Sequence, residues 1–478
     1  MRLTGGYNIL LQGRPDARIE VLPEPQKLVV PLSSRRFNFS DIRVQAGQKI
    51  NGGDILAQDP ENYNVPLLAP RAGVVRLDPE KKHIVLENIS KTEFAYVAQG
   101  DLPHIVRQMG KAGINRHKLL SLGAWQFICD AYAGKLPDPL GKPQAVIVST
   151  LSLEPFVARG DVQLKKRLLN FTRGLEHLQS LLEYQPIYLV MTKVGSDIEK
   201  QVHRNIRGYA WAKIIEIPLT YPLDDFNILA RFIGLKKDAG PVWSLRTEGV
   251  LAVDRALTLS KPSLVRIISI GGPEVDSPVH LKAMTGYPVN AILDKYVSNP
   301  DVRVINGGIL TGSTIDDKNL GLDTECRGLT MLPEHTEREF LGFIRPGWDR
   351  SCYAECFLSS FRKKFRERYT SAMRGELRPC VSCNFCEEVC PAGIMPHLIH
   401  KYLYDDMIEE ADEARIDLCI RCGLCSYVCP SKIELTQQFA DAQVMIEEEK
   451  EQIRAEQLRK EKLHEEELAR RRASEESY

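Results

Sequence analysis

The chain has 478 residues, of which 43% are apolar, and its 63 Lys and Arg residues balance 63 Asp and Glu residues. Because one hydrophobic core rarely grows beyond about 250–300 residues, several domains are expected. The even charge balance argues against nucleic acid as a partner. The longest apolar stretches, such as Leu264–Ile270, fall well short of the roughly 20 residues that a membrane span needs. We therefore expect any association with a membrane to come through a partner.

Residues 1–93 are expected to form an N-terminal extension followed by a small β module. Gly5 and Gly6 suit an extended, loop-rich start. Short apolar segments separated by glycine turns follow at Val44–Ala57 and Val65–Leu77, as in small antiparallel strands. This pattern resembles the barrel-sandwich hybrid fold of biotinyl and lipoyl domains. Those domains carry their cofactor on a lysine, and no lysine occurs in Asn64–Pro70, so we expect a structural module.

Residues 94–258 are expected to form a Rossmann-like α/β domain. Ala145–Ser149 and Ile187–Met191 are strand-like runs, and Ile105–Leu122 and Val162–Leu182 have the apolar spacing of helices. Such a domain is a candidate site for FMN or NADH. No Gly-x-Gly-x-x-Gly pattern follows a strand here, but a helix N-terminus can bind phosphate without that motif. The sequence therefore leaves a nucleotide site open.

Residues 259–320 are expected to form a second, smaller β-rich domain. Val265–Ile270 and Asp301–Ile305 are predicted strands, and Leu281–Ala283 and Val289–Lys295 are predicted to be short helices or turns between them. Residues 321–372 follow as a helical linker region.

Four of the twelve cysteines lie outside residues 373–440, where the other eight are concentrated. Cys352 and Cys356 are four residues apart and would share one face of a helix, where ordinary packing is favoured over a further metal site. Cys129 and Cys326 are isolated and are expected to be buried as small apolar side chains.

The other eight of the twelve cysteines occur in residues 373–440 as two copies of one pattern: Cys380-x-x-Cys383-x-x-Cys386-x-x-x-Cys390-Pro391 and Cys419-x-x-Cys422-x-x-Cys425-x-x-x-Cys429-Pro430. This is the spacing of a bacterial-type [4Fe–4S] site, in which the fourth ligand comes from the other motif. We therefore assign Cys380, Cys383, Cys386 and Cys429 to cluster 1, and Cys419, Cys422, Cys425 and Cys390 to cluster 2.

Zinc and disulfides are the alternatives to iron–sulfur clusters. A third closely spaced cysteine followed by Cys-Pro suits tetrahedral zinc poorly, and tight cysteine triplets suit metal better than disulfides. Met395–Glu413 has helical spacing, so the motifs are expected to lie in a helical ferredoxin domain. His397 and His400 follow the first motif and are candidates for tuning its cluster, but surface positions on the helix are favoured for both. Residues 441–478 are expected to be a charged helical tail.

Several stretches of the first 365 residues resemble the A subunit of the sodium-translocating NADH:quinone reductase. They are Lys135–Thr150 after Trp125, the glycine-rich Arg303–Gly312, and Leu332–Gly347. The resemblance implies a β-grasp domain, of the kind that binds soluble ligands, at residues 259–320. That subunit has no ferredoxin domain, whereas the order of domains in this chain resembles the C subunit of the related Rnf complex. The Gly-rich flavin and NADH motif of the Rnf subunit is missing, because Met109–Gly113 stands in its place.

The resemblance implies an electron-transfer subunit of an ion-translocating NADH:quinone or ferredoxin:NAD oxidoreductase, peripheral on the cytoplasmic face of the bacterial inner membrane. Its partners would be membrane-embedded and flavoprotein subunits, with NADH, ferredoxin or quinone as redox partners. Its cofactors would be two [4Fe–4S] clusters, with FMN or quinone as further candidates. A soluble flavin- or NADH-binding iron–sulfur oxidoreductase, and a structural adaptor stabilised by its clusters, are the competing hypotheses. No acid–base catalytic residue is predicted.

Overall fold

The computed structural model describes residues 3–78, 80, 82–90, 104–182, 185–193, 195–334, 346–362, 365–372 and 376–475. The chain divides into two compact units. The first contains the described residues up to Ala372 except Thr4–Gly6, and the second contains Thr4–Gly6 together with the chain beyond Ala372. The short N-terminal segment Thr4–Gly6 therefore packs with the cysteine-rich end of the chain.

The β module of the first unit consists of two antiparallel sheets. One sheet has the order β2 (Leu28–Pro31), β8 (His83–Ser90), β7 (Ala72–Leu77), β4 (Lys49–Ile50), and the other β3 (Asp41–Ile42), β5 (Ile55–Asp59), β6 (Val65–Leu68). Leu28 and Ile84 are fully buried within this module. Among the described strands the two sheets remain separate and do not close into one barrel.

The middle of the first unit is an α/β domain built on a five-stranded sheet. Its strand order is β12 (Ala212–Ile217), β11 (Ile187–Thr192), β10 (Ala145–Ser149), β13 (Val242–Arg246), β9 (Cys129–Asp130). The first four strands pair in parallel, and β9 is antiparallel to β13. The strand that comes first among the parallel ones, β10, is central, as in doubly wound sheets. The predicted alternation of strands and helices is therefore present.

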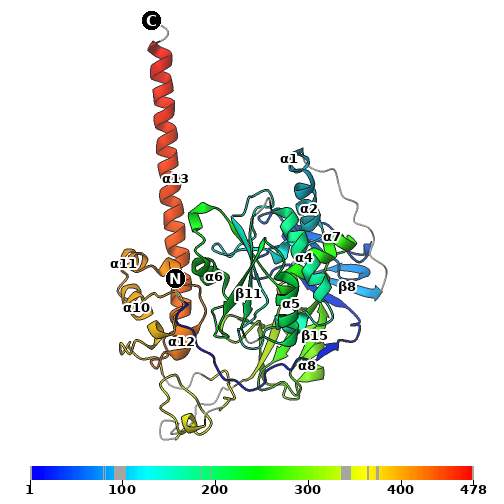
Figure 1. Cartoon of the computed structure of the whole chain (residues 1–478), viewed down its shortest axis with the longest axis vertical. Helices are drawn as coiled ribbons and strands as arrows, with labels where there is room; N and C mark the ends of the chain where they lie inside the picture. The colour runs from blue at the N-terminus through cyan, green and yellow to red at the C-terminus, as the bar shows by residue number, and fades with distance from the viewer. Residues whose placement is uncertain are drawn as a thin grey trace. The chain divides into compact units, whose positions relative to one another are not determined.

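Helices cover both faces of this sheet. The longer ones are α2 (Gly110–Ser121), α4 (Leu168–Leu181), α5 (Asp197–Ile206), α6 (Phe226–Ile233) and α7 (Thr247–Leu259); α1 (His104–Gln108), α3 (Gly160–Gln163), η1 (Ala124–Phe127) and η2 (Lys237–Ala239) are shorter. Figure 1 shows α6 on one side of β11 and α4 and α5 on the other. Local sequence sets the helix ends: Ser196 and Glu199 form a capping box at the start of α5, and Gly234 ends α6 with a φ of 87°.

A six-stranded sheet with α8 (Val289–Tyr296) completes the first unit. Its order is β1 (Ile19–Val21), β15 (Val279–Met284), β14 (Val265–Gly271), β18 (Gly328–Pro333), β16 (Val302–Asn306), β17 (Ser313–Thr314). The predicted strands and the helix at 289–295 are present, but residues 281–283 lie in strand β15 rather than in a helix or turn. Pairing with both β1 and β14 accounts for this difference, because it satisfies the backbone of β15 on both sides.

The segment at 321–372, expected to be a helical linker, differs from that prediction. Its first part forms β18, an almost wholly buried strand between β14 and β16. In its described residues after 345, the one helical segment is η4 (Leu358–Phe361). Long-range pairing with β14 and β16, which local periodicity does not register, decides the conformation of β18. Residues 335–345 lie outside the described residues, and they include most of Leu332–Gly347, one of the stretches that resemble the sodium-translocating family.

The second unit is helical, as predicted for its ferredoxin-like part and its tail. It contains α9 (Phe385–Glu388), α10 (Pro396–Tyr404), α11 (Ile408–Glu413), η5 (Ile416–Leu418), α12 (Leu424–Val428) and α13 (Leu435–Glu475). Phe439, Ala442 and Ile446 bury the start of α13 against the shorter helices, whereas the side chains from Glu451 to Glu465 are exposed. Figure 1 shows α13 as one long continuous helix. In the described part of the chain, no helix combines the length and apolarity that crossing a bilayer requires.

Candidate iron–sulfur sites

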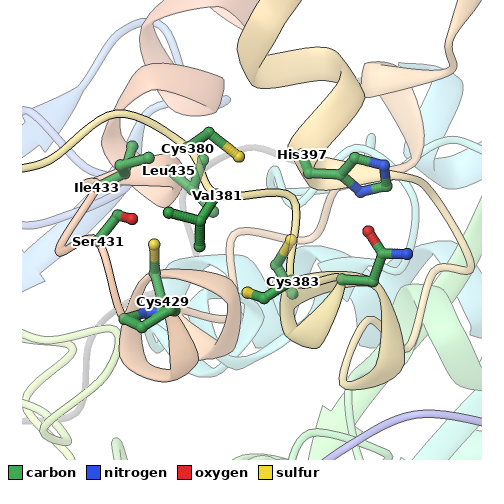
Figure 2. Close-up of a pocket in the computed structure, with 11 residues that line it drawn as sticks. Cys380, Val381, Cys383, His397, Cys429, Ser431, Ile433 and Leu435 are labelled. Carbon is green, nitrogen blue, oxygen red and sulfur yellow. The ribbon is translucent and has the colours of Figure 1, made fainter.

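Four cysteines from both motifs line one pocket in the second unit: Cys380, Cys383, Cys386 and Cys429. Cys386 lies on α9, and Cys429 follows the last residue of α12. Figure 2 shows Cys380, Cys383 and Cys429 around this pocket, with Val381 between them and His397 to one side. These are the four residues predicted from the sequence to hold cluster 1.

A second pocket is lined by the remaining four motif cysteines: Cys390, Cys419, Cys422 and Cys425. Cys425 lies on α12, and Cys390 comes two residues after the end of α9. The structure therefore brings together the set predicted as cluster 2. Each pocket receives three sulfurs from one motif and one sulfur from the other.

The two motifs share one backbone conformation, which explains their equivalent roles. Asn384 precedes α9 with a φ of 62°, and Gly423 precedes α12 with a φ of 81°, so each helix begins after a left-handed residue. Ser382 and Arg421, two positions earlier, are also left-handed, with φ values of 52° and 54°. Two successive reversals of the chain curl each Cys-x-x-Cys-x-x-Cys segment around its pocket. The short helix then carries the last cysteine of each motif toward the other pocket.

The electrostatics of both pockets disfavour free thiolates. Burial, with neighbouring thiols as a further cause, raises the pKa of Cys386 and of Cys419 to about 12. Burial also raises the pKa of Cys422 well above its ordinary value, and raises that of Cys425. Thiolates collected in such a place require compensating positive charge, which iron ions supply. The eight sulfurs, in two groups of four, therefore fit two iron–sulfur clusters.

Polar groups beside the pockets differ between the two sites. At the second pocket the Thr436 hydroxyl lies 3.6 Å from Cys425 Sγ, and the backbone N–H of Arg421 donates to Cys419 Sγ at 3.4 Å. At the first pocket His397 is a lining residue, and its Nδ1 has no hydrogen-bond partner in the described structure, although Glu387 lies 3.6 Å away. His400 lines neither pocket, and its Nδ1 bonds Gln438 at 2.7 Å.

The N-terminal segment contributes a contact that was not predicted from the sequence. The Gly6 N–H donates to the Val389 carbonyl at 2.9 Å, directly before Cys390. A Cβ atom added at Gly5 would lie 2.5 Å from the Cys390 carbonyl oxygen, and Gly5 has a φ of 69°. Only glycine suits both conditions. The Gly5-Gly6 pair was the available signal, but the sequence does not reveal its partner almost 400 positions away.

The cysteines outside the motifs are placed differently. Cys326 is buried and Cys129 is partly buried. Cys352 and Cys356 do not share a helix face as predicted, because they flank a turn in which the Glu355 N–H donates to the Cys352 carbonyl. Glu355 has a φ of 52°, and this left-handed residue is incompatible with continuing a helix.

Family comparisons identify the classes of domain in this chain. Residues 111–259 match the NqrA second alpha/beta domain, residues 267–317 match the NQRA C-terminal domain, and residues 376–433 match the 4Fe–4S dicluster domain. The chain thus carries NqrA domains followed by a C-terminal 4Fe–4S dicluster domain.

Curated relatives extend the similarity over most of the chain. The A subunit of the Na(+)-translocating NADH-quinone reductase of Neisseria meningitidis is 25% identical over 422 residues, which cover 87% of this chain and 91% of the relative. The corresponding protein of Alcanivorax borkumensis is 24% identical, with 83% of this chain and 87% of the relative covered. A crystal structure of an NAD+-reducing [NiFe]-hydrogenase matches with a TM-score of 0.39 and 12% identity over 83% of this chain and 77% of that one. The predicted resemblance to the sodium-translocating enzyme is confirmed.

Proposed function

We propose that this protein is the electron-transfer subunit of a membrane-associated, ion-translocating oxidoreductase of the NADH:quinone reductase type. In this proposal two [4Fe–4S] clusters relay electrons between a redox donor and the partner subunits. The grouping of eight cysteines into two adjacent sets of four carries the proposal, because one pair of short helices links both sets. The similarity to the A subunit of the Na(+)-translocating enzyme supports the type of complex.

Cluster 1 would be held by Cys380, Cys383, Cys386 and Cys429, and cluster 2 by Cys419, Cys422, Cys425 and Cys390. The clusters supply one-electron chemistry when bound. The chain buries their thiolates, directs the Thr436 hydroxyl toward one ligand sulfur, and places the imidazole of His397 beside the other site. Hydrogen bonding to sulfur and burial set the potential of such centres. The different polar neighbours favour different potentials for the two clusters, which gives electron flow a direction.

The remaining features of the proposal follow the family. Membrane-embedded and flavoprotein subunits would be the partners, at the cytoplasmic face of the bacterial inner membrane. The β module would be a barrel-sandwich hybrid domain, the α/β domain Rossmann-like, and the six-stranded sheet a β-grasp domain. FMN, NADH or quinone would bind the chain only if the α/β or β-grasp domain retains a site for it.

Separate removal of the clusters tests the central proposal. The anaerobically purified chain should contain about eight iron atoms, the content of two [4Fe–4S] clusters. Cys383→Ser and Cys422→Ser should each lose about half of the iron and one of the two reducible EPR signals. Both variants should abolish electron transfer in the assembled complex. Cys129→Ser, which changes a cysteine outside both pockets, is the matched control. Full electron transfer by both motif variants would disprove the relay.

Addition of NADH distinguishes the relay from an enzyme with its own hydride-accepting site. A relay is reduced by dithionite or a reduced ferredoxin but not by NADH alone. Bleaching of the cluster absorbance by NADH, together with flavin released on denaturation, would instead favour a flavin site in the α/β domain. Clusters that no donor reduces would favour a purely structural role.

A further inference from the structure

A pair of thiols in the first unit is placed for chemistry that the cluster relay does not use. The Sγ atoms of Cys352 and Cys356 lie 3.1 Å apart, and the Cys356 N–H points at Cys352 Sγ at 3.3 Å. Cys356 is exposed, whereas Cys352 is partly buried. The Cys356 thiol is therefore accessible to a reactant from solution, and the partly buried Cys352 thiol lies within reach of it.

The chain anchors this turn on both sides. Before it, the Ser351 N–H and hydroxyl both donate to the buried carboxylate of Glu367, at 3.2 Å and 2.6 Å. After it, the Leu358 N–H donates to the Pro346 carbonyl at 3.0 Å. These hydrogen bonds fix the backbone on both sides of the turn. The short distance between the two sulfurs is therefore set by the fold.

Aromatic packing fixes the middle of the turn. The ring of Tyr353, between the two cysteines, packs edge-on against Tyr7 at a centroid distance of 5.1 Å. Burial, together with the nearby Glu355 and Cys352, raises the pKa of Tyr7, so that phenol stays neutral beside the thiols. Burial and the neighbouring Cys356 also raise the pKa of Cys352. The exposed Cys356 is therefore the better placed of the two to act first.

We propose that Cys352 and Cys356 form a thiol–disulfide exchange site that reacts with low-molecular-weight disulfides. The Cys356 thiolate attacks one sulfur of the incoming disulfide, and the other sulfur leaves as a thiolate. The Cys352 thiolate then attacks Cys356 Sγ in the mixed disulfide and expels the second thiolate. The protein dithiol is oxidised by two electrons, the small disulfide is reduced to two thiols, and the two protein thiol protons pass to those products.

This disulfide would be readily reversible. It closes a ring across a turn of five residues, and its outer sulfur is exposed, both of which favour a labile bond over a permanent structural one. The pair lies in a part of the chain with no role in the cluster sites, so the inference does not rest on the proposed relay.

Glutathione redox buffers test the proposal on the full-length protein. After equilibration, free thiols are trapped by acid quench and alkylation, and the chain is digested with trypsin. Cleavage after Arg350 and Arg362 releases a peptide with Cys352 and Cys356 and no other cysteine. We expect this peptide to pass from the doubly alkylated form to an internal disulfide, which carries no alkyl group and is two hydrogens lighter than the unmodified dithiol peptide. The transition should span roughly a hundredfold change in the ratio of oxidised glutathione to the square of reduced glutathione.

Two variants separate the steps. Cys352→Ser should trap glutathione on Cys356, because the resolving thiol is missing. Cys356→Ser should react at Cys352 at least tenfold more slowly than the parent reacts at Cys356. The peptide that carries Cys129 reports general oxidation and should stay alkylated throughout. A parent peptide that remains doubly alkylated in every buffer, or that holds glutathione on Cys356 without closing the ring, would overturn the proposal. The alkylation state of this peptide is measured independently of iron content. A negative result here would therefore leave the proposed cluster relay untouched, and a negative cluster experiment would leave this proposal untouched.

Discussion

The Glu154 carboxylate accepts two hydrogen bonds from Thr311, one from its backbone N–H and one from its hydroxyl group, each at 2.8 Å. The Leu310 N–H adds a third at 3.2 Å. Glu154 belongs to the loop that leaves the carboxyl end of β10, and Thr311 belongs to the glycine-rich turn between β16 and β17. One carboxylate therefore joins the five-stranded and six-stranded sheets, at the end of the sheet where doubly wound domains bind ligands.

Glu154→Ala should lower the free energy of unfolding by about 1–3 kcal/mol, because it leaves two backbone N–H groups and a hydroxyl without their acceptor. Glu154→Gln keeps the acceptor oxygen and most of the shape, so it should recover more than half of the loss. Chemical denaturation followed by the fluorescence of the buried Trp125 and Trp243 measures both. Equal losses in the two variants would mean that side-chain packing, and not the hydrogen bonds, matters at this position.

Gly5→Ala should disturb cluster 2 and spare cluster 1. The new methyl group would overlap the Cys390 carbonyl and force that residue away from its pocket. We expect up to half of the iron to be lost and one EPR signal to disappear. Gly47→Ala is the matched control, since Gly47 has a φ of 82° but nothing lies within 4 Å of the added atom. If Gly5→Ala retains both clusters at full occupancy, the N-terminal segment does not support the site.

Thr436→Val should lower the reduction potential of cluster 2 and leave that of cluster 1 unchanged. A ligand thiolate can only accept, so the Thr436 hydroxyl 3.6 Å from Cys425 Sγ is the donor, and its loss removes a partial positive charge. Ser431→Ala is a fitting control, because Ser431 lines the first pocket but donates to the Pro379 carbonyl. Redox titration followed by EPR gives both potentials. Equal shifts of the two clusters would contradict the local explanation.

Burial of the Cys326 thiol should make the first unit less stable at alkaline pH. Burial raises its pKa from 9.0 to about 12 in the folded chain, so above pH 9 the unfolded chain loses a proton that the folded chain retains. The free energy of unfolding should therefore fall as the pH rises through this window, approaching about 1.4 kcal/mol per pH unit for this one group. Cys326→Ser, which can keep the bond to the Gly328 carbonyl, should lose that component of the slope. Identical slopes in denaturation series would refute the assignment.

The sequence predicted what depends on short separations along the chain. Two-residue gaps bring three cysteines to one side of a tight loop, and apolar periodicity marks β10, β11, α4 and α8. That Cys429 joins the first three cysteines around one pocket was also predictable, because it follows from the repetition of one motif. These features need only local geometry or a repeated pattern.

Tertiary structure alone decided the features that join distant segments. β18 is a buried strand because β14 and β16 flank it, although its own periodicity did not separate it from a linker. Gly5 must be glycine because Cys390 lies against it, and Cys352 and Cys356 meet across a turn that contacts with Glu367 and Tyr7 hold in place. Each of these outcomes depends on which surfaces pack together. Packing depends on volume and hydrogen bonding summed over the whole unit, which no single stretch of sequence contains.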